Sequence, residues 1–205
     1  MSDSPLSSLA GPLALTAGGL FAAVHVGLFA VADRTDLQAM LANPTFRFFN
    51  IAYAVAFWGL MIALVALYVR QSREAGRFGV IGLSAAIVGT MALGSDMWFE
   101  AFASPWVTAV APELLTAEKA PIWQVGYLSS YLLFAFGWTL FGVTCLRARV
   151  LPAAVSAAIV VGGLVGFFAA MPPFGVPLGL AVAAAGAWLM RSTRVNPGPG
   201  AVVGR

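Results

Sequence analysis

Three ionisable side chains lie inside long apolar stretches of this sequence. His25 falls within residues 12–32. Asp96 and Glu100 fall within residues 78–102, four positions apart and therefore on one face of a helix. An ionisable group at the centre of a membrane costs about 2.5–3.5 kcal/mol on insertion scales, so each of the three needs an explanation. A carboxylate pair beside an imidazole can donate and accept protons, which is the basis of acid–base catalysis.

The same three residues also fit a structural role. Polar side chains tie membrane helices together through hydrogen bonds, which is the alternative explanation for His25. Glu100 lies near the end of its apolar stretch, where a carboxylate can reach water. Asp96 lies deeper and has no such exit, so a functional role is favoured there. We therefore keep Asp96, Glu100 and His25 as the candidate catalytic residues.

Aromatic and polar side chains gather at a similar depth in the predicted membrane. At a rise of 1.5 Å per residue, His25 and Asp96 lie about 10 Å, and Tyr53 and Tyr127 about 8–9 Å, from the outer ends of their stretches. Residues 122–146 also carry an aromatic stripe on one helix face. Such a layer suits a cavity for an apolar or cationic ligand, although packing of the outer loops is the alternative. The candidate ligand-binding residues are Tyr53, Trp98, Trp123, Gln124, Tyr127, Tyr131 and Phe134.

The composition places these residues in a membrane protein. Of the 205 residues, 60% are hydrophobic and 9% are charged. Soluble domains have about 45–50% apolar and about 25% charged residues, so soluble enzymes and nucleic-acid binders are excluded. We predict an all-α polytopic bundle of six transmembrane helices over residues 12–190, with a short N-terminus (1–11) and a flexible basic tail (191–205). The apolar stretches, each near the length of about 20 residues that one span needs, are 12–32, 48–69, 78–102, 122–146, 150–171 and 174–190.

Basic side chains are unevenly divided between the two sides of this bundle. Three, Arg34, Arg47 and Lys119, fall on the side opposite the termini. The positive-inside rule then places both termini in the cytoplasm. The Ala-, Gly- and Arg-rich composition is typical of a bacterial chain, so the predicted location is the bacterial inner membrane. The basic residues on the side of the termini are Arg70, Arg73, Arg77, Arg147, Arg149, Arg191, Arg194 and Arg205.

Two long outer loops are predicted to contain short amphipathic helices. Residues 35–38 (TDLQ) form a capping-box pattern ahead of apolar residues at helical spacing. Loop 103–121 has two helix-start patterns, at Ser104-Pro105 and at Pro112-Glu113. Loops of this length are more often functional caps than simple connections. We therefore expect two helices that lie over the outer end of the bundle.

Proline and small residues predict where helices break and where they pack closely. Pro172, Pro173 and Pro177 divide the last apolar run into two helices joined by a turn. Small residues at intervals of three or four let neighbouring helices approach each other in a membrane. Those in the third and fifth stretches are Gly79, Gly82, Ala86, Gly89, Gly162, Gly163 and Gly166.

Most of the chain resembles a type of small bacterial multi-pass inner-membrane protein with six helices. The likeness is carried by residues 67–71 (LYVRQ), 98–102 (WFEAF) leading to Pro105, 111–115 (APELL) and 146–152 (LRARVLP). These motifs are biased towards common membrane residues. The resemblance implies a fold and no activity.

Four functions remain open from the sequence. The leading hypothesis is the binding of a hydrophobic or amphiphilic small molecule in a polar and aromatic cavity in the outer half of the bundle. The alternatives are an acid–base enzyme of the isoprenoid or lipid cyclase or isomerase type that uses Asp96 and Glu100, a proton-coupled exporter, and a structural subunit of a membrane complex. We predict contact with the lipid bilayer and none with nucleic acid, while the sequence identifies no protein partner. One cysteine and one histidine cannot build a multi-cysteine or bis-histidine metal site, so we predict no cofactor and no metal.

Overall fold

The computed structural model describes residues 5–32, 35–115 and 117–195, and every regular element within them is a helix. This confirms the all-α prediction for that part of the chain. Arg34, the first four residues and the tail from residue 196 lie outside the described residues. The elements are α1 (Pro5–Val31), α2 (Leu37–Ala42), α3 (Pro44–Phe102), α4 (Ser104–Val110), the 3-10 helix η1 (Pro112–Leu115), α5 (Pro121–Ala148), α6 (Ala153–Val165), the 3-10 helix η2 (Gly166–Phe168) and α7 (Val176–Val195).

Three helices are long and apolar enough to cross a membrane: α1, α3 and α5. Their outward surfaces carry large apolar side chains, such as Phe29, Ile81 and Phe136, each more than half exposed. Water disfavours a surface of this kind, whereas lipid tails accept it. Length and composition thus make these helices candidate membrane spans and support a membrane location.

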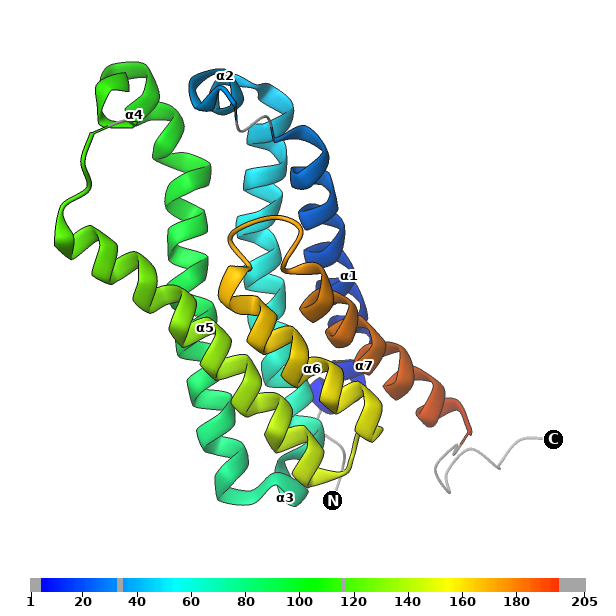
Figure 1. Cartoon of the computed structure of the whole chain (residues 1–205). Coiled ribbons are helices and arrows are strands. Elements are labelled where there is room, and N and C mark those ends of the chain that lie inside the picture. The colour runs from blue at the N-terminus through cyan, green and yellow to red at the C-terminus, as the bar shows by residue number, and fades with distance from the viewer. Residues whose placement is uncertain (1–4, 33–34, 116, 196–205) are drawn as a thin grey trace.

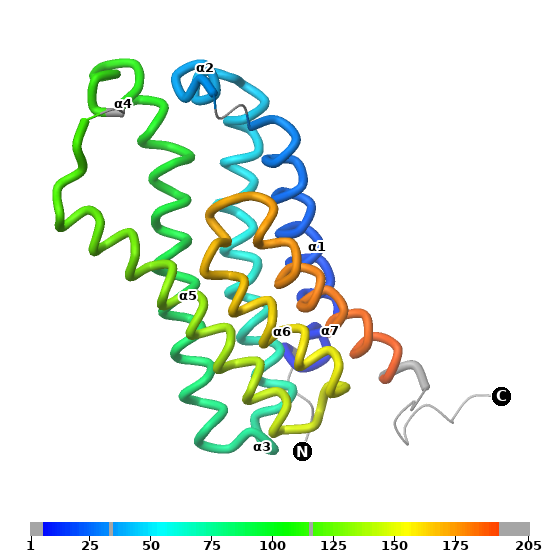
Figure 2. Tube along the Cα trace, in the orientation of Figure 1, coloured from blue at the N-terminus to red at the C-terminus, as the bar shows by residue number. Residues whose placement is uncertain are grey.

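Helix α3 is a hairpin that turns back at Gly76. The backbone there has φ 54° and ψ −147°, a conformation that glycine adopts without a steric penalty. Figures 1 and 2 show the chain running along one arm, reversing at this turn and returning beside it. We call residues 44–75 the first arm and residues 77–102 the second arm. They contain the predicted second and third apolar stretches, but the predicted loop 70–77 is helical on both sides of Gly76.

The longer helices pack against neighbours that run antiparallel to them. The hairpin of α3 lies between α1 and α5, while α7 packs on α1 and α6 packs on α5 (Figure 1). Close approach occurs at the predicted small residues: a Cβ atom on Gly89 would lie 2.2 Å from the Leu133 carbonyl oxygen of α5. An equivalent contact that was not predicted joins α1 to α7, where Gly18 and Gly179 face each other's backbone. Glycine at these crossings lets the helix axes approach.

The predicted aromatic stripe of α5 forms much of the core. Phe134, Trp138 and Phe141 are fully buried, and the Phe134 ring centroid lies 5.7 Å from that of Phe57 on α3. The indole Nε1 of Trp138 donates to Thr90 Oγ1 at 3.0 Å, which satisfies its buried N–H group. The stripe therefore joins α5 to both arms of the hairpin.

Two short helices, α2 and α4, occupy the predicted outer loops and lie at the end of the molecule opposite the Gly76 turn (Figure 1). The predicted capping box of Thr35 and Gln38 is replaced by a simple N-cap one residue later. Asp36, rather than Thr35, caps α2, and its Oδ1 accepts a hydrogen bond of 2.9 Å from the Ala39 amide. A carboxylate is an effective N-cap acceptor, which explains the later start.

Helix α6 ends earlier than the predicted stretch 150–171. It stops at Val165, and η2 adds only residues to Phe168. Residues 169–175, which include the predicted prolines Pro172 and Pro173, form the turn that leads into α7. Figure 1 shows this turn lower along the bundle than α2 and α4.

Candidate functional site

The imidazole of His25 holds the turn between η2 and α7. His25 is fully buried, and its Nε2 lies 2.8 Å from the carbonyl oxygen of Ala169. Its Nδ1 lies 2.8 Å from the Phe21 carbonyl oxygen, one helical turn earlier in α1. The Tyr53 hydroxyl lies 2.9 Å from Nε2 and donates to the same Ala169 oxygen. Non-helical backbone deep in a membrane protein needs such partners, so this geometry matches the structural alternative for His25.

Each of the two carboxylates accepts a hydrogen bond from a different serine hydroxyl. The Ser130 hydroxyl of α5 donates to Asp96 Oδ2 and lies 2.8 Å from the Tyr127 carbonyl oxygen. Glu100 Oε2 accepts a hydrogen bond of 3.2 Å from Ser104 at the start of α4. The three candidate catalytic residues therefore belong to three separate hydrogen-bonded sets rather than to one. The hydrogen-bond partners of His25 are Phe21, Ala169 and Tyr53, although a similar depth had suggested an imidazole beside the carboxylates. Depth along a helix does not fix the direction in which a side chain points.

Two adjoining hollows lie beneath α2 and α4, and we call them together the cap cavity. The Tyr53 hollow has a volume of about 380 Å³ and reaches Tyr53 and the turn at residues 170–172. The Lys119 hollow has a volume of about 410 Å³ and reaches α4, η1 and Lys119. Both volumes fall within the range of roughly 300–1,000 Å³ that is usual for small-molecule sites. The residues that line both hollows are Leu37, Met40, Phe46, Glu100 and Tyr127.

The cap cavity combines a mainly apolar wall with a few polar groups. Glu100 lines both hollows, and Asn50 lines the Tyr53 hollow. The Lys119 ammonium lines the Lys119 hollow but donates to the Leu114 carbonyl oxygen at 2.6 Å. A small number of polar groups in an apolar and aromatic wall is typical of a ligand site. The aromatic side chains of the Lys119 hollow are Phe46, Phe99, Trp123 and Tyr127.

The predicted ligand-binding residues are divided between this cavity and other places. Tyr53, Trp123 and Tyr127 line the cap cavity. Tyr131 is buried behind Tyr127, with ring centroids 4.6 Å apart. Gln124 is exposed and only approaches the Lys119 backbone, with Nε2 3.5 Å from its carbonyl oxygen. The other two lie elsewhere: Phe134 is in the core and Trp98 lines a groove on the hairpin.

Most of the residues that line the cap cavity were not predicted as site residues, and five of these belong to the short outer helices. Three of them, Leu37, Met40 and Leu41, come from α2, and Val107 and Leu114 come from α4 and η1. The signal was present, because the apolar spacing that predicts an amphipathic α2 also gives it a face to bury. That face covers the cavity.

Asp96 lines a third hollow of about 450 Å³ beside the cap cavity. Its wall is completed by α5 and the residues before it, and it shares Trp123 and Tyr127 with the Lys119 hollow. The two carboxylates, although four residues apart on one helix, therefore line different hollows. Tyr127 lines this hollow and both hollows of the cap cavity.

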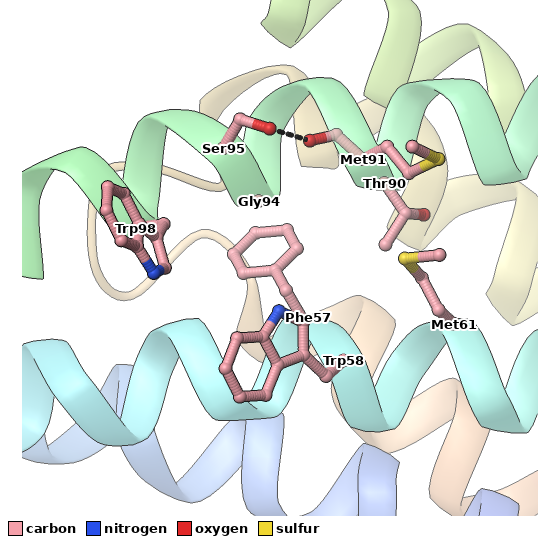
Figure 3. Close-up of a pocket in the computed structure, with 8 residues that line it drawn as sticks. All are labelled: Phe57, Trp58, Met61, Thr90, Met91, Gly94, Ser95 and Trp98. Carbon is pink, nitrogen blue, oxygen red and sulfur yellow. Dashed lines mark hydrogen bonds between the residues drawn. The ribbon is translucent and has the colours of Figure 1, made fainter.

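A further groove of about 380 Å³ lies between the two arms of α3. Figure 3 shows Phe57, Trp58 and Met61 on the first arm facing Met91 and Trp98 on the second. Its hydroxyl groups already donate to their own helix: Ser95 to the Met91 carbonyl oxygen and Thr90 to that of Ala86. The two hydroxyl groups of the groove are thus already used as donors within the helix.

Within the residues that the structure describes, no three or more His, Cys, Asp or Glu side chains gather to hold a metal ion. No family model, curated protein or solved structure matches this chain.

Proposed function

We propose that this protein binds a hydrophobic or amphiphilic small molecule in the cap cavity. The observation that carries the proposal is the pair of adjoining hollows whose walls are apolar and aromatic and whose junction holds Glu100. Sites for small molecules are concave, mostly apolar and supplied with few polar groups. The helices α2 and α4 act as the outer cover of this site.

The binding site belongs, in this proposal, to a bundle that crosses the bacterial inner membrane six times with both termini in the cytoplasm. The crossings are α1, the two arms of α3, α5, α6 with η2, and α7. Supporting this, the Gly76 turn and the α5–α6 connection lie at one end and α2 and α4 at the other (Figure 1). Arg77 and Arg147 belong to the first end, where the Arg147 guanidinium lies 4.6 Å from the centroid of the Phe78 ring. The positive-inside rule makes that end cytoplasmic.

The geometry favours binding over the acid–base alternative. Acid–base catalysis requires its donor and acceptor to reach the same substrate. Asp96 and Glu100 line different hollows, and His25 is occupied by the backbone of Phe21 and Ala169. Ligand binding requires only an apolar wall with a few polar groups, which the cap cavity has.

Filling the Lys119 hollow should abolish binding without unfolding the protein. Val107 of α4 lines this hollow, whereas Val110 of the same helix is 59% exposed. We expect Val107→Trp to occupy the ligand's space and Val110→Trp to leave it open. Ligand that binds only the folded state raises stability by about 2.7 kcal/mol at a hundred times its dissociation constant. The measurement is the thermal unfolding midpoint in lipid nanodiscs during a titration with decanol.

The wild-type protein and Val110→Trp should show a saturable rise in this midpoint, and Val107→Trp should not. A saturable rise of equal size in all three proteins would place the bound molecule outside the cap cavity. No saturable rise with decanol or its charged analogues in the wild-type protein would contradict the proposed function itself.

A further inference from the structure

We infer that the cap cavity selects an amphiphile whose head group carries an ammonium, with Glu100 as its charge partner. This inference rests on the proposed function and names the class of ligand.

Glu100 retains capacity to accept hydrogen bonds from a ligand. A carboxylate has about four acceptor positions. The hydrogen bond that Glu100 accepts from a described residue is the one of 3.2 Å from the Ser104 hydroxyl. Lys119 lines the same hollow and attracts Glu100 through its charge, but its ammonium donates its hydrogen bond to the Leu114 carbonyl oxygen. The carboxylate therefore lines the cavity with acceptor positions to spare.

The aromatic wall around Glu100 has the composition of a cation site. Phe99 and Trp123 meet edge to face, with centroids 5.8 Å apart and an interplanar angle of 68°. Phe46 and Tyr127 line the same hollow with them. The faces of aromatic rings attract ammonium groups, and such rings are the usual partners of quaternary amines. A carboxylate among aromatic rings favours a cation over a neutral head group, since a neutral head group gains no charge attraction.

The Tyr53 hollow offers a place for the chain of the same molecule. It continues from Glu100 towards Leu28, Met97 and Ala170, all with apolar side chains. The apolar wall accepts an alkyl chain, whose transfer out of water into such surroundings is favourable. The two hollows thus fit the two ends of an amphiphile, head group in the Lys119 hollow and chain in the Tyr53 hollow.

The test compares three decyl amphiphiles that differ only in head group. Decyltrimethylammonium, decanol and ionised decanoate are titrated against the full chain in phosphatidylcholine nanodiscs, and affinity is taken from the unfolding midpoint. We expect the wild-type protein to bind decyltrimethylammonium about tenfold more tightly than decanol, equivalent to about 1.4 kcal/mol. Glu100→Gln should remove this preference, so that the variant binds decyltrimethylammonium no more tightly than decanol, and a saturable rise of its unfolding midpoint with decanol shows that the variant is folded. Glu118→Gln makes the same chemical change at an exposed loop position and should keep the preference.

The possible failures are distinguishable. Equal affinities for decanol and decyltrimethylammonium in the wild-type protein would overturn the ammonium inference and leave the proposed function standing. Tightest binding of decanoate, lost in Lys119→Met, would overturn it in favour of an anionic head group. Loss of the ammonium preference in Glu118→Gln as well as Glu100→Gln would assign it to general surface charge and overturn the role of Glu100.

Discussion

Gly175→Ala is expected to destabilise the protein by about 2–3 kcal/mol, the upper part of the range for overpacking in a core. A Cβ atom at this position would lie 2.0 Å from Nε2 and 2.1 Å from Cε1 of His25. The ring cannot rotate away freely, because it is fully buried and both its nitrogens contact backbone carbonyl oxygens. The added methyl group must therefore displace either the imidazole or the turn at residues 169–175. The loss is measured as the free energy of unfolding in mixed micelles.

The double variant His25→Ala/Gly175→Ala tests whether contact with the His25 ring causes this loss of stability. His25→Ala removes the ring and leaves the Ala169 carbonyl oxygen to Tyr53, so it is destabilising by itself. In the His25→Ala background the Gly175→Ala change should cost little, because the atoms it would meet are gone. Neighbouring sites that share a contact are expected to be non-additive in this way. Additive losses would show that the turn is not held by the His25 ring.

Gly137→Ala is expected to lower stability by about 3 kcal/mol and to weaken ligand binding as well. A Cβ atom there would lie 2.4 Å from the Ala85 carbonyl oxygen and 2.7 Å from the Ala86 Cα atom, both in the backbone of α3. A backbone clash cannot be relieved by a change of rotamer, so α5 must move away from the second arm of α3. Because α5 carries Trp123 and Tyr127 opposite Glu100, this movement also opens the cap cavity.

Gly126 of the same helix provides the matched control. A Cβ atom at Gly126 would have no neighbour within 4 Å. Replacing a helical glycine with alanine in open space stabilises a helix by roughly 0.5–1 kcal/mol. Thermal unfolding and the decanol titration should therefore separate Gly126→Ala from Gly137→Ala. Similar behaviour of the two variants would mean that the α3–α5 contact does not depend on a missing side chain at Gly137.

Local sequence patterns were sufficient to predict most of the helices, including short helices in both outer loops. Hydropathy and length identified α1, the arms of α3 and α5, because a stretch with few charges and enough residues to span a membrane has few other stable conformations. The polar spacing at residues 35–38 identified α2, and only its N-cap was displaced by one residue, to Asp36. Small residues in the second arm and in α6 marked close helix contacts that the structure contains. Each of these features depends on residues that lie close together in the sequence.

The arrangement of the polar groups could not be predicted from local sequence patterns. Counting residues from the end of each stretch placed His25 and Asp96 at one depth, but a count gives no rotation about the helix axis. The side chain of His25 bonds to Ala169, 144 residues away, and that partner exists only because α6 ends early. Asp96 bonds instead to Ser130 of α5. The cap cavity depends equally on tertiary packing, since its walls come from α2, α3, α4, η1 and α5.

Protection of a cysteine at position 107 tests most directly whether the ligand sits in the cap cavity. Cys145 is the single native cysteine and is fully buried, so it does not compete for a thiol reagent. Val107→Cys places a thiol on the wall of the Lys119 hollow, and Val110→Cys places one on the exposed side of α4. We predict that saturating decyltrimethylammonium slows maleimide labelling at position 107 at least about tenfold and leaves the rate at position 110 unchanged, since a bound molecule excludes reagent only from the space it fills. Labelling at position 107 that proceeds at the same rate with and without the amphiphile would contradict the account.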